Sequence, residues 1–187
     1  MRNYGWKKNI FDKVLAFVML LFLLPFFFVF YIIISFDTQS NGVFIQTRVG
    51  QFGNLFTIYK FKTIHPKTRN ISKIGGFFRK YKLDELSQLF NILKGEMSFV
   101  GPRPDIPGYY DLLKGDNRRV LQLKPGLTSE ASIKYRNEEF LLSQQVDPLK
   151  YNDEVIFPDK VKMNLEYLEK MSLWNDIKII FRTFINL

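Results

Sequence analysis

The sequence contains no cysteine and only one histidine, His65, among 187 residues. The absence of cysteine excludes disulfides, thiolate catalysis and cysteine-type zinc sites. A single histidine excludes a histidine-rich metal site. Any bound metal would therefore take oxygen ligands, which is the preference of Mg²⁺. The sequence also lacks internal repeats and low-complexity linkers, and its length suits one domain with or without an appendage.

Acidic residues are scarce relative to basic ones. The chain has 27 Lys and Arg against 18 Asp and Glu, which gives a formal net charge of +9. Such an excess indicates an anionic partner: a nucleic acid, an anionic membrane surface or a phosphorylated substrate. A nucleic-acid-binding surface would gather its cations in a stripe free of apolar neighbours. Here many of the 20 phenylalanines lie beside the basic residues, so we expect a membrane and no nucleic acid.

The 23 residues from Val14 to Phe36 contain no charge. This length suffices for a helix to cross the hydrocarbon core of a bilayer, and no small-residue cleavage site follows it. Pro25 stands in the middle and divides the run into arms of about 11 residues, each too short to span a membrane alone. Basic residues, which favour the cytoplasmic side, flank both ends. From these residues, a straight transmembrane helix and a hairpin that enters and leaves by one face both remain open.

Residues 43–64 alternate apolar and polar side chains on both sides of a turn bracketed by Gly50 and Gly53, which predicts a β-hairpin. From Leu83 the apolar residues follow a helical spacing, and Gly95 is a plausible C-terminal stop. The stretch before that helix, residues 74–83, mixes aromatic and basic residues as interfacial segments do.

The C-terminal half predicts further helices. The pattern of residues 123–142 predicts a Pro-Gly turn, a short strand or extended piece, and a charged helix. The tail from Lys160 to Leu187 is helical in pattern, and its last part suits either a packed core helix or an interfacial one. Together these elements predict an α+β chain: residues 1–40 form a membrane segment, and residues 41–187 form a small cytoplasmic-facing domain of amphipathic helices with a short β-hairpin.

Asp84 and Glu85 stand side by side where the predicted helix begins. The structural explanation is that Asp84 caps the helix and Glu85 opposes its dipole. The chemical explanation is phosphoryl transfer, in which one carboxylate attacks phosphorus, another holds Mg²⁺ and cations clamp the phosphate oxygens. The candidate cations are Lys60, Arg79, Arg103 and Arg136.

Several stretches resemble one known family over nearly the whole chain. They are "VFIQTRVGQFGNLFTIYKFKTI", "LDELSQLFNILKGEMSFVGPRP", "KPGLT" and "SLWNDIKIIFRT". The central block is the most specific of them. The sequence resembles the small monotopic phosphoglycosyl transferases, also called bacterial sugar transferases. The resemblance implies transfer of a phosphosugar from a UDP-sugar to polyprenyl (undecaprenyl) phosphate, with release of UMP and with Mg²⁺ as cofactor.

The resemblance also implies roles for individual residues. Asp84 would be the nucleophile that forms a covalent aspartyl-phosphosugar intermediate, and Glu85, with Asp84, would hold the magnesium ion. The residues that would bind substrate or phosphate are Lys60, Arg79, Arg103 and Arg136. The family's N-terminal helix is a re-entrant hairpin broken at a proline, which Pro25 matches and which favours the hairpin over the straight span.

The partners that the resemblance implies are a UDP-sugar, expected to be a UDP-N-acetylated hexose, polyprenyl phosphate and inner-membrane lipid. It places the protein on the cytoplasmic face of the bacterial inner membrane as a monotopic protein, at the first membrane step of glycoconjugate assembly. The alternative is a catalytically idle membrane-bound scaffold of the same fold.

Overall fold

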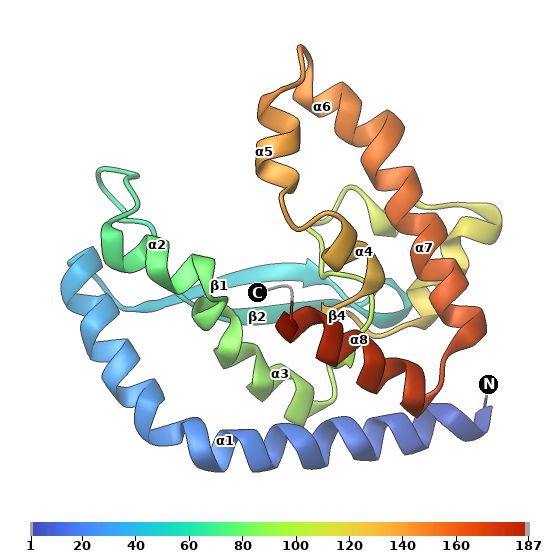
Figure 1. Ribbon diagram of the computed structural model, residues 1–187, viewed down its shortest axis with the longest axis horizontal. Helices are drawn as coiled ribbons and strands as arrows, with labels where there is room; N and C mark the ends of the chain where they lie inside the picture. Colours follow the sequence, from blue (N-terminus) through green and yellow to red (C-terminus); the bar gives the residue numbers. More distant parts are fainter. Residues whose placement is uncertain (1, 186–187) are drawn as a thin grey trace. The chain divides into compact units, whose positions relative to one another are not determined.

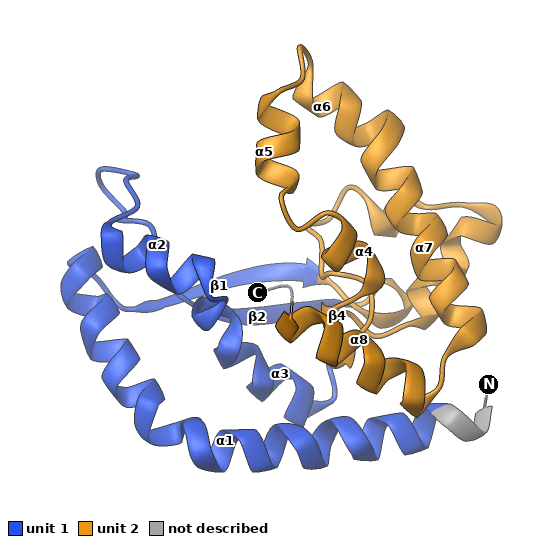
Figure 2. Ribbon diagram, viewed as in Figure 1, with its two compact units in different colours: residues 1–48, 55–97, 187 blue, residues 49–54, 98–186 orange. Residues whose placement is uncertain are grey.

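The computed structural model describes residues 2–185, which form two compact units (Figure 2). Unit 1 takes the chain up to residue 48 and residues 55–97, and unit 2 takes residues 49–54 and the chain from residue 98 onward. Helices and short strands occur in both, which confirms the predicted α+β class. The predicted boundary at residue 40 separates a membrane segment from a catalytic domain by their expected roles, and it does not coincide with the boundary between the two compact units. The assignment of these roles stays a prediction.

Unit 1 begins with a helix, α1 (Arg2–Thr38), that is longer than the uncharged run. Pro25 lies inside α1, and the helix bends along its length but does not break (Figure 1). The two separate arms of about 11 residues that the sequence predicted are therefore not formed, because α1 continues through Pro25. Proline removes one backbone hydrogen bond and crowds the carbonyl four residues back, while the flanking hydrogen bonds persist, so the helix can kink and continue. Whether it re-enters the membrane surface is a question of topology that the fold alone leaves untested.

One narrow stripe of α1 is buried, and it includes Ala16, Leu20 and Ile34. The other faces carry large exposed apolar side chains; Phe22 is 73% exposed and Phe36 is 81% exposed. Within the described residues, α1 is the one helix long and apolar enough to cross a membrane. Exposed apolar surface on this scale is typical of a lipid-facing helix rather than of a core helix in water.

The other elements of unit 1 are β1 (Val43–Val49), β2 (Leu55–Phe61), α2 (Lys73–Lys80), a 3₁₀ helix η2 (Leu83–Gln88) and α3 (Leu89–Lys94). Strands β1 and β2 pair across a five-residue connection, as the alternation predicted; a link this short requires an antiparallel hairpin. Aromatic rings join α1, β2 and α2, with centroids 5.1–6.2 Å apart. They belong to Phe27, Phe30, Phe61 and Phe78.

The predicted helix from Leu83 differs at its start. Its first six residues form the 3₁₀ helix η2, and the α-helix proper begins only at Leu89. Its end is as predicted, because Gly95 takes the left-handed conformation, with φ 85°, that glycine adopts at low cost.

Unit 2 contains a short parallel pair, β3 (Ser98–Val100) and β4 (Gly126–Thr128), with Ser98 opposite Gly126. Its helices are η1 (Gln51–Gly53), η3 (Tyr110–Leu112), η4 (Gly115–Gln122), α4 (Glu130–Lys134), α5 (Glu138–Ser143), α6 (Pro148–Tyr151), the π-helix η5 (Asn152–Ile156), α7 (Phe157–Lys170) and α8 (Leu173–Ile185). The Pro-Gly turn and the strand expected over residues 123–142 are thus confirmed, whereas the single charged helix expected after them is divided into α4 and α5. The helical tail is confirmed as two helices, and residues 186 and 187 lie outside the described part.

Two backbone segments approach each other closely at Gly101 and Gly126 in unit 2. A Cβ on Gly101 would collide with the carbonyl oxygen of Lys124, and a Cβ on Gly126 would collide with the backbone of Gly101. The amide of Gly101 donates to the carbonyl of Thr128 at 3.0 Å, and that of Gly126 donates to the carbonyl of Pro102 at 2.8 Å. This crossing fixes the start of the Gly-Pro-Arg-Pro loop.

Candidate active site

Asp84 and Glu85 lie in the first turn of η2. The cap position before this turn belongs to Lys82, whose backbone takes an uncommon left-handed conformation with φ 55° and whose side chain makes no capping hydrogen bond. The capping role considered for Asp84 therefore does not hold. A left-handed lysine costs conformational energy and is found where the surrounding structure imposes it, often next to functional residues.

Glu85 forms an ion pair with Lys60 of β2. The Lys60 Nζ lies 2.9 Å from Glu85 Oε1, and the side chains are only 18% and 10% exposed. At this degree of burial the pair is shielded from solvent more than surface ion pairs are. The pairing fixes the Glu85 carboxylate beside Asp84 and keeps a positive charge close to both carboxylates.

The Asp84 carboxylate is in an unfavourable environment for its charge. Burial raises the pKa of Asp84 above its usual value and the neighbouring Glu85 raises it further, while Lys60 and Lys82 partly offset both effects. Asp84 Oδ1 is buried and finds no hydrogen-bond partner among residues 2–185. Because buried oxygens are nearly always paired, an unpaired one beside an ion pair indicates a site for a ligand, a metal or a reacting group.

Arg79 lies in the last turn of α2, in the same unit as the acidic pair and five residues before Asp84. Helices α2 and η2 contact each other. The structure therefore brings Lys60, Asp84 and Glu85 into one cluster and places Arg79 on a neighbouring element.

Arg103 lies in unit 2, exposed on the loop that follows β3. The base of this loop is held by the Gly101–Gly126 crossing and by the hydroxyl of Tyr167, whose oxygen lies 3.4 Å from the carbonyl oxygen of Val100. The Tyr167 hydroxyl also bonds to the buried carboxylate of Asp176 at 2.5 Å. The loop is thus anchored to both C-terminal helices of its unit.

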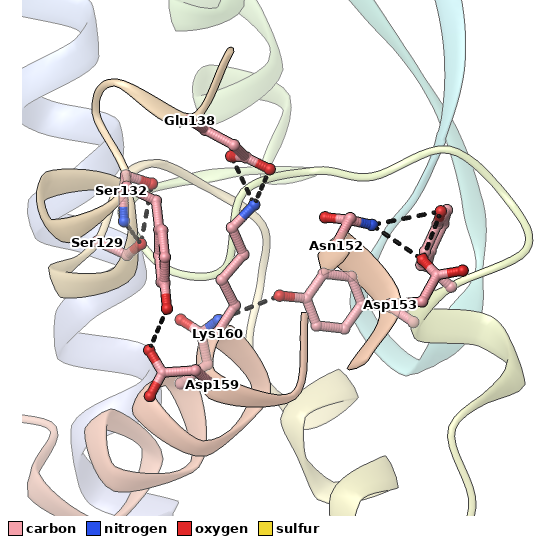
Figure 3. A network of polar contacts seen from close by, with 11 residues as sticks. Ser129, Ser132, Glu138, Asn152, Asp153, Asp159 and Lys160 are labelled. Atoms are coloured by element: carbon pink, nitrogen blue, oxygen red, sulfur yellow. Dashed lines mark hydrogen bonds and ion pairs between the residues drawn. The ribbon is translucent and has the colours of Figure 1, made fainter. Parts of the chain in front are cut away.

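Arg136 is also exposed in unit 2, in the loop between α4 and α5. Both sides of that loop are attached to the start of α7 (Figure 3): the Tyr135 hydroxyl donates to Asp159 at 2.7 Å, and Lys160 donates to both oxygens of Glu138 at 2.7 Å. The grouping of Arg103 and Arg136 with the acidic pair, which lies in the other unit, stays a prediction.

The donor set around Asp84 suits a hard cation that also binds substrate. No group of three or more His, Cys, Asp or Glu residues able to hold a metal occurs in the described part of the chain. Mg²⁺ commonly takes one or two carboxylates together with waters and substrate phosphates rather than a cage of protein ligands. Asp84, with its unpaired oxygen, and Glu85 fit that pattern.

Comparison with known protein families assigns the chain. Its residues 3–187 match the bacterial sugar transferase family. The chain belongs to the bacterial sugar transferases. The resemblance inferred from the motifs is thereby confirmed.

Curated members of the family are similar to this bacterial sugar transferase. One is the UDP-glucose:undecaprenyl-phosphate glucose-1-phosphate transferase of Escherichia coli, 33% identical over 189 residues, which cover 92% of this chain and 38% of that protein. The galactosyl transferase CpsE of Streptococcus agalactiae is 33% identical over 76% of this chain and 33% of its own length. The sugar transferase EpsL of Bacillus subtilis is 32% identical over 77% and 68%. The chain thus spans about a third of the length of the first two.

Sequence reasoning alone missed three residues around the acidic pair of this bacterial sugar transferase. Lys82 contributes its charge and its left-handed backbone, while Ser87 and Asn91 donate hydrogen bonds to strand β2. Asn91 carried a detectable signal, because it is a polar residue inside an apolar run with helical spacing. Lys82 and Ser87 carried none that separates them from surface residues.

Proposed function

We propose that the protein transfers a phosphosugar from a UDP-sugar to polyprenyl (undecaprenyl) phosphate and releases UMP. The observation that carries the proposal is the buried, unpaired Asp84 oxygen beside the Lys60–Glu85 ion pair. Family membership supports it, as does the activity named for the Escherichia coli relative.

In the first step, an Asp84 carboxylate oxygen attacks the phosphorus that bears the sugar. A new oxygen–phosphorus bond forms, the bond from that phosphorus to the bridging oxygen breaks, and UMP leaves with the bridging oxygen. In the second step, a phosphate oxygen of polyprenyl phosphate attacks the same phosphorus and releases the Asp84 carboxylate. Division into two displacements at a carboxylate is nucleophilic catalysis.

The cations have separate roles in this scheme. Lys60 holds Glu85 and, by its charge, favours the ionised form of Asp84 that can attack. Arg79, Arg103 and Arg136 are proposed to bind phosphate oxygens of the two substrates, for which the guanidinium geometry is suited.

Glu85 and Asp84 would hold a magnesium ion. When bound, this ion would neutralise charge that develops on the phosphate oxygens. We expect EDTA to abolish UMP release and added Mg²⁺ or Mn²⁺ to restore it, and Glu85→Gln to impair transfer severely through weaker metal binding. Full activity in the chelator would contradict this role.

The sugar is the least constrained part of the proposal. A UDP-N-acetylated hexose is the expectation from the motifs, whereas the relatives are named for glucose and galactose. A panel of UDP-glucose, UDP-galactose and UDP-N-acetylhexosamines, assayed with undecaprenyl phosphate, would identify the donor by its UMP release.

We further propose that α1 is a re-entrant helix, with Pro25 at its deepest point, that attaches the protein to the cytoplasmic face of the inner membrane. The apolar exposed surface of α1 supports membrane attachment, and the bend together with basic residues on both flanks supports re-entry.

The decisive experiment has two readouts on the purified protein. UMP release should require both substrates for turnover, and intact-mass measurement with UDP-sugar alone should find an adduct of one sugar phosphate. Peptide mapping should locate that adduct on Asp84. Turnover by Asp84→Asn above a few per cent would disprove the nucleophilic role, and wild-type protein that converts no UDP-sugar would leave the idle scaffold as the function.

A further inference from the structure

Strand β2 is paired with β1 along one edge, and two carbonyls of its other edge accept hydrogen bonds from side chains. Asn91 Nδ2 donates to the carbonyl of Thr57 at 2.6 Å, and Ser87 Oγ donates to the carbonyl of Tyr59 at 2.9 Å. Two donors from η2 and α3 thus take the place that a third strand would occupy.

The distance between the two donors along the helical segment matches the distance between the two acceptors along β2. Ser87 near the end of η2 and Asn91 in α3 both reach β2, and Thr57 and Tyr59 are two residues apart and therefore face the same strand edge. Two strand residues advance about 6.6 Å, and the helical segment from Ser87 to Asn91 advances about 6–7 Å, so both hydrogen bonds form together in a single register.

Asn91 is held in place for this contact. It is fully buried, and its Nδ2 also donates to Glu96 Oε2 at 2.7 Å. Its backbone carbonyl accepts from the amides of Glu96 and Met97 where the chain leaves α3. The Asn91 side chain is therefore held by a contact outside β2 as well as by β2 itself, as suits a positioning group.

We propose that Ser87 and Asn91 are positioning residues that fix the register of β2 against η2 and thereby hold Lys60 opposite Glu85. Lys60 directly follows Tyr59, the residue that Ser87 binds. A slip of one residue would turn the Lys60 side chain to the opposite face of the strand, because side chains alternate with a period of two. The catalytic consequence rests on the function proposed above.

The kinetic test is a double-mutant cycle on UMP release. Ser87→Ala should lower kcat about five- to tenfold with KM nearly unchanged, because a small displacement of the charged group weakens the chemical step more than binding. In a Lys60→Met background the same substitution should have almost no further effect. Ser143→Ala, which removes a serine hydroxyl bonded to a backbone carbonyl in α5, is the matched control and should leave kcat unchanged.

Chemical footprinting tests the positioning without relying on activity. Acetylation of Lys60, read by mass spectrometry against Lys134, should accelerate several-fold in Ser87→Ala and more in Asn91→Ala, with circular dichroism confirming that both variants are folded. An unchanged Lys60 acetylation rate in both folded variants would overturn the proposal. So would a Ser87→Ala loss of kcat that is equally large with and without Lys60.

The two proposals fail in different ways. If wild-type protein converts no UDP-sugar but both variants expose Lys60 to acetylation, the proposed function has failed and the positioning role stands. If wild-type protein is active and neither variant changes Lys60 reactivity, the positioning role has failed alone.

Discussion

At the scale of single residues, the burial of Asp84 affects both its reactivity and the stability of the fold. The pKa of Asp84 is raised by burial first and by Glu85 second, so its ionised form is disfavoured in the folded chain. A carboxylic acid with a raised folded-state pKa stabilises the fold at low pH, and this contribution is lost as the pH rises through the folded-state pKa. At neutral pH the charge therefore destabilises the fold.

We expect Asp84→Asn to abolish turnover and to raise the thermal midpoint of the metal-free protein at neutral pH. The amide is a poor nucleophile, but it removes a buried negative charge that lacks a partner at Oδ1. Differential scanning fluorimetry in EDTA measures the second effect. Asp116→Asn is the control, because that carboxylate is 73% exposed and its loss should change neither quantity. A lower thermal midpoint for Asp84→Asn would mean that neighbouring groups compensate the negative charge of Asp84 in the folded protein.

The pH dependence of kcat/KM should carry the same signature. Because attack needs ionised Asp84, activity should fall as the pH drops through the raised pKa, at a higher pH than for an ordinary aspartate. Lys60→Met should move this acidic limb to still higher pH, since Lys60 lowers the pKa of Asp84. Lys94→Met should leave the acidic limb of the pH profile unchanged. An acidic limb that is also unchanged in Lys60→Met would contradict its assignment to Asp84.

At the scale of elements, the bend in α1 is the feature on which topology depends. We expect Pro25→Ala to restore the missing hydrogen bond and straighten α1, so that part of the population places its N-terminus outside the cell. The measurement is labelling of a cysteine introduced at position 3 by a membrane-impermeant thiol reagent; the native chain has no other thiol.

In the otherwise unmodified protein that cysteine should be protected in intact cells and labelled after lysis. Ready labelling from outside before Pro25 is changed would establish an ordinary transmembrane helix. The catalytic proposal would survive that result, because the acidic pair follows α1 in the chain on either topology.

The elements that the sequence predicted correctly are those with a local signal. The hairpin over residues 43–61 follows from strict alternation around two glycines, and the end of α3 follows from Gly95. The 3₁₀ start of η2 was not predictable, because 3₁₀ and α-helices share nearly the same apolar spacing over one turn. The parallel β3–β4 pair was missed because three-residue strands joined through distant residues have no periodicity to detect.

The residues of the candidate site also differ in how far the sequence alone indicates them. Asp84 and Glu85 were singled out because adjacent carboxylates with nearby cations suit phosphoryl transfer and because the family resemblance implies that they are the catalytic pair, and their catalytic role stays a prediction. That Lys60 would contact Glu85, 25 residues away, depends on how β2 packs against η2. Such contacts are set by hydrogen bonds like those of Ser87 and Asn91, which no local pattern encodes.

At the scale of the whole molecule, a net charge of +9 accompanies a large exposed apolar surface on α1. High salt screens electrostatic attraction to anionic lipid or nucleic acid but leaves apolar insertion intact. We therefore expect the protein to stay in the membrane fraction after a high-salt wash and to leave it only in detergent. Recovery in the salt wash would favour a purely electrostatic binder, including a nucleic-acid-binding protein.

The backbone crossing at Gly101 and Gly126 also affects how sequence variation in this protein should be interpreted. Each missing Cβ would meet backbone rather than a flexible side chain, so no second substitution at a neighbouring side chain can make room for it. A saturation-mutagenesis map should record both positions as intolerant of every replacement, as completely as Asp84. Intolerance at Gly101 and Gly126 shows only that two backbone segments are in contact. The map alone does not separate such positions from residues that contact the substrate, and the chemistry of each residue is needed to tell them apart.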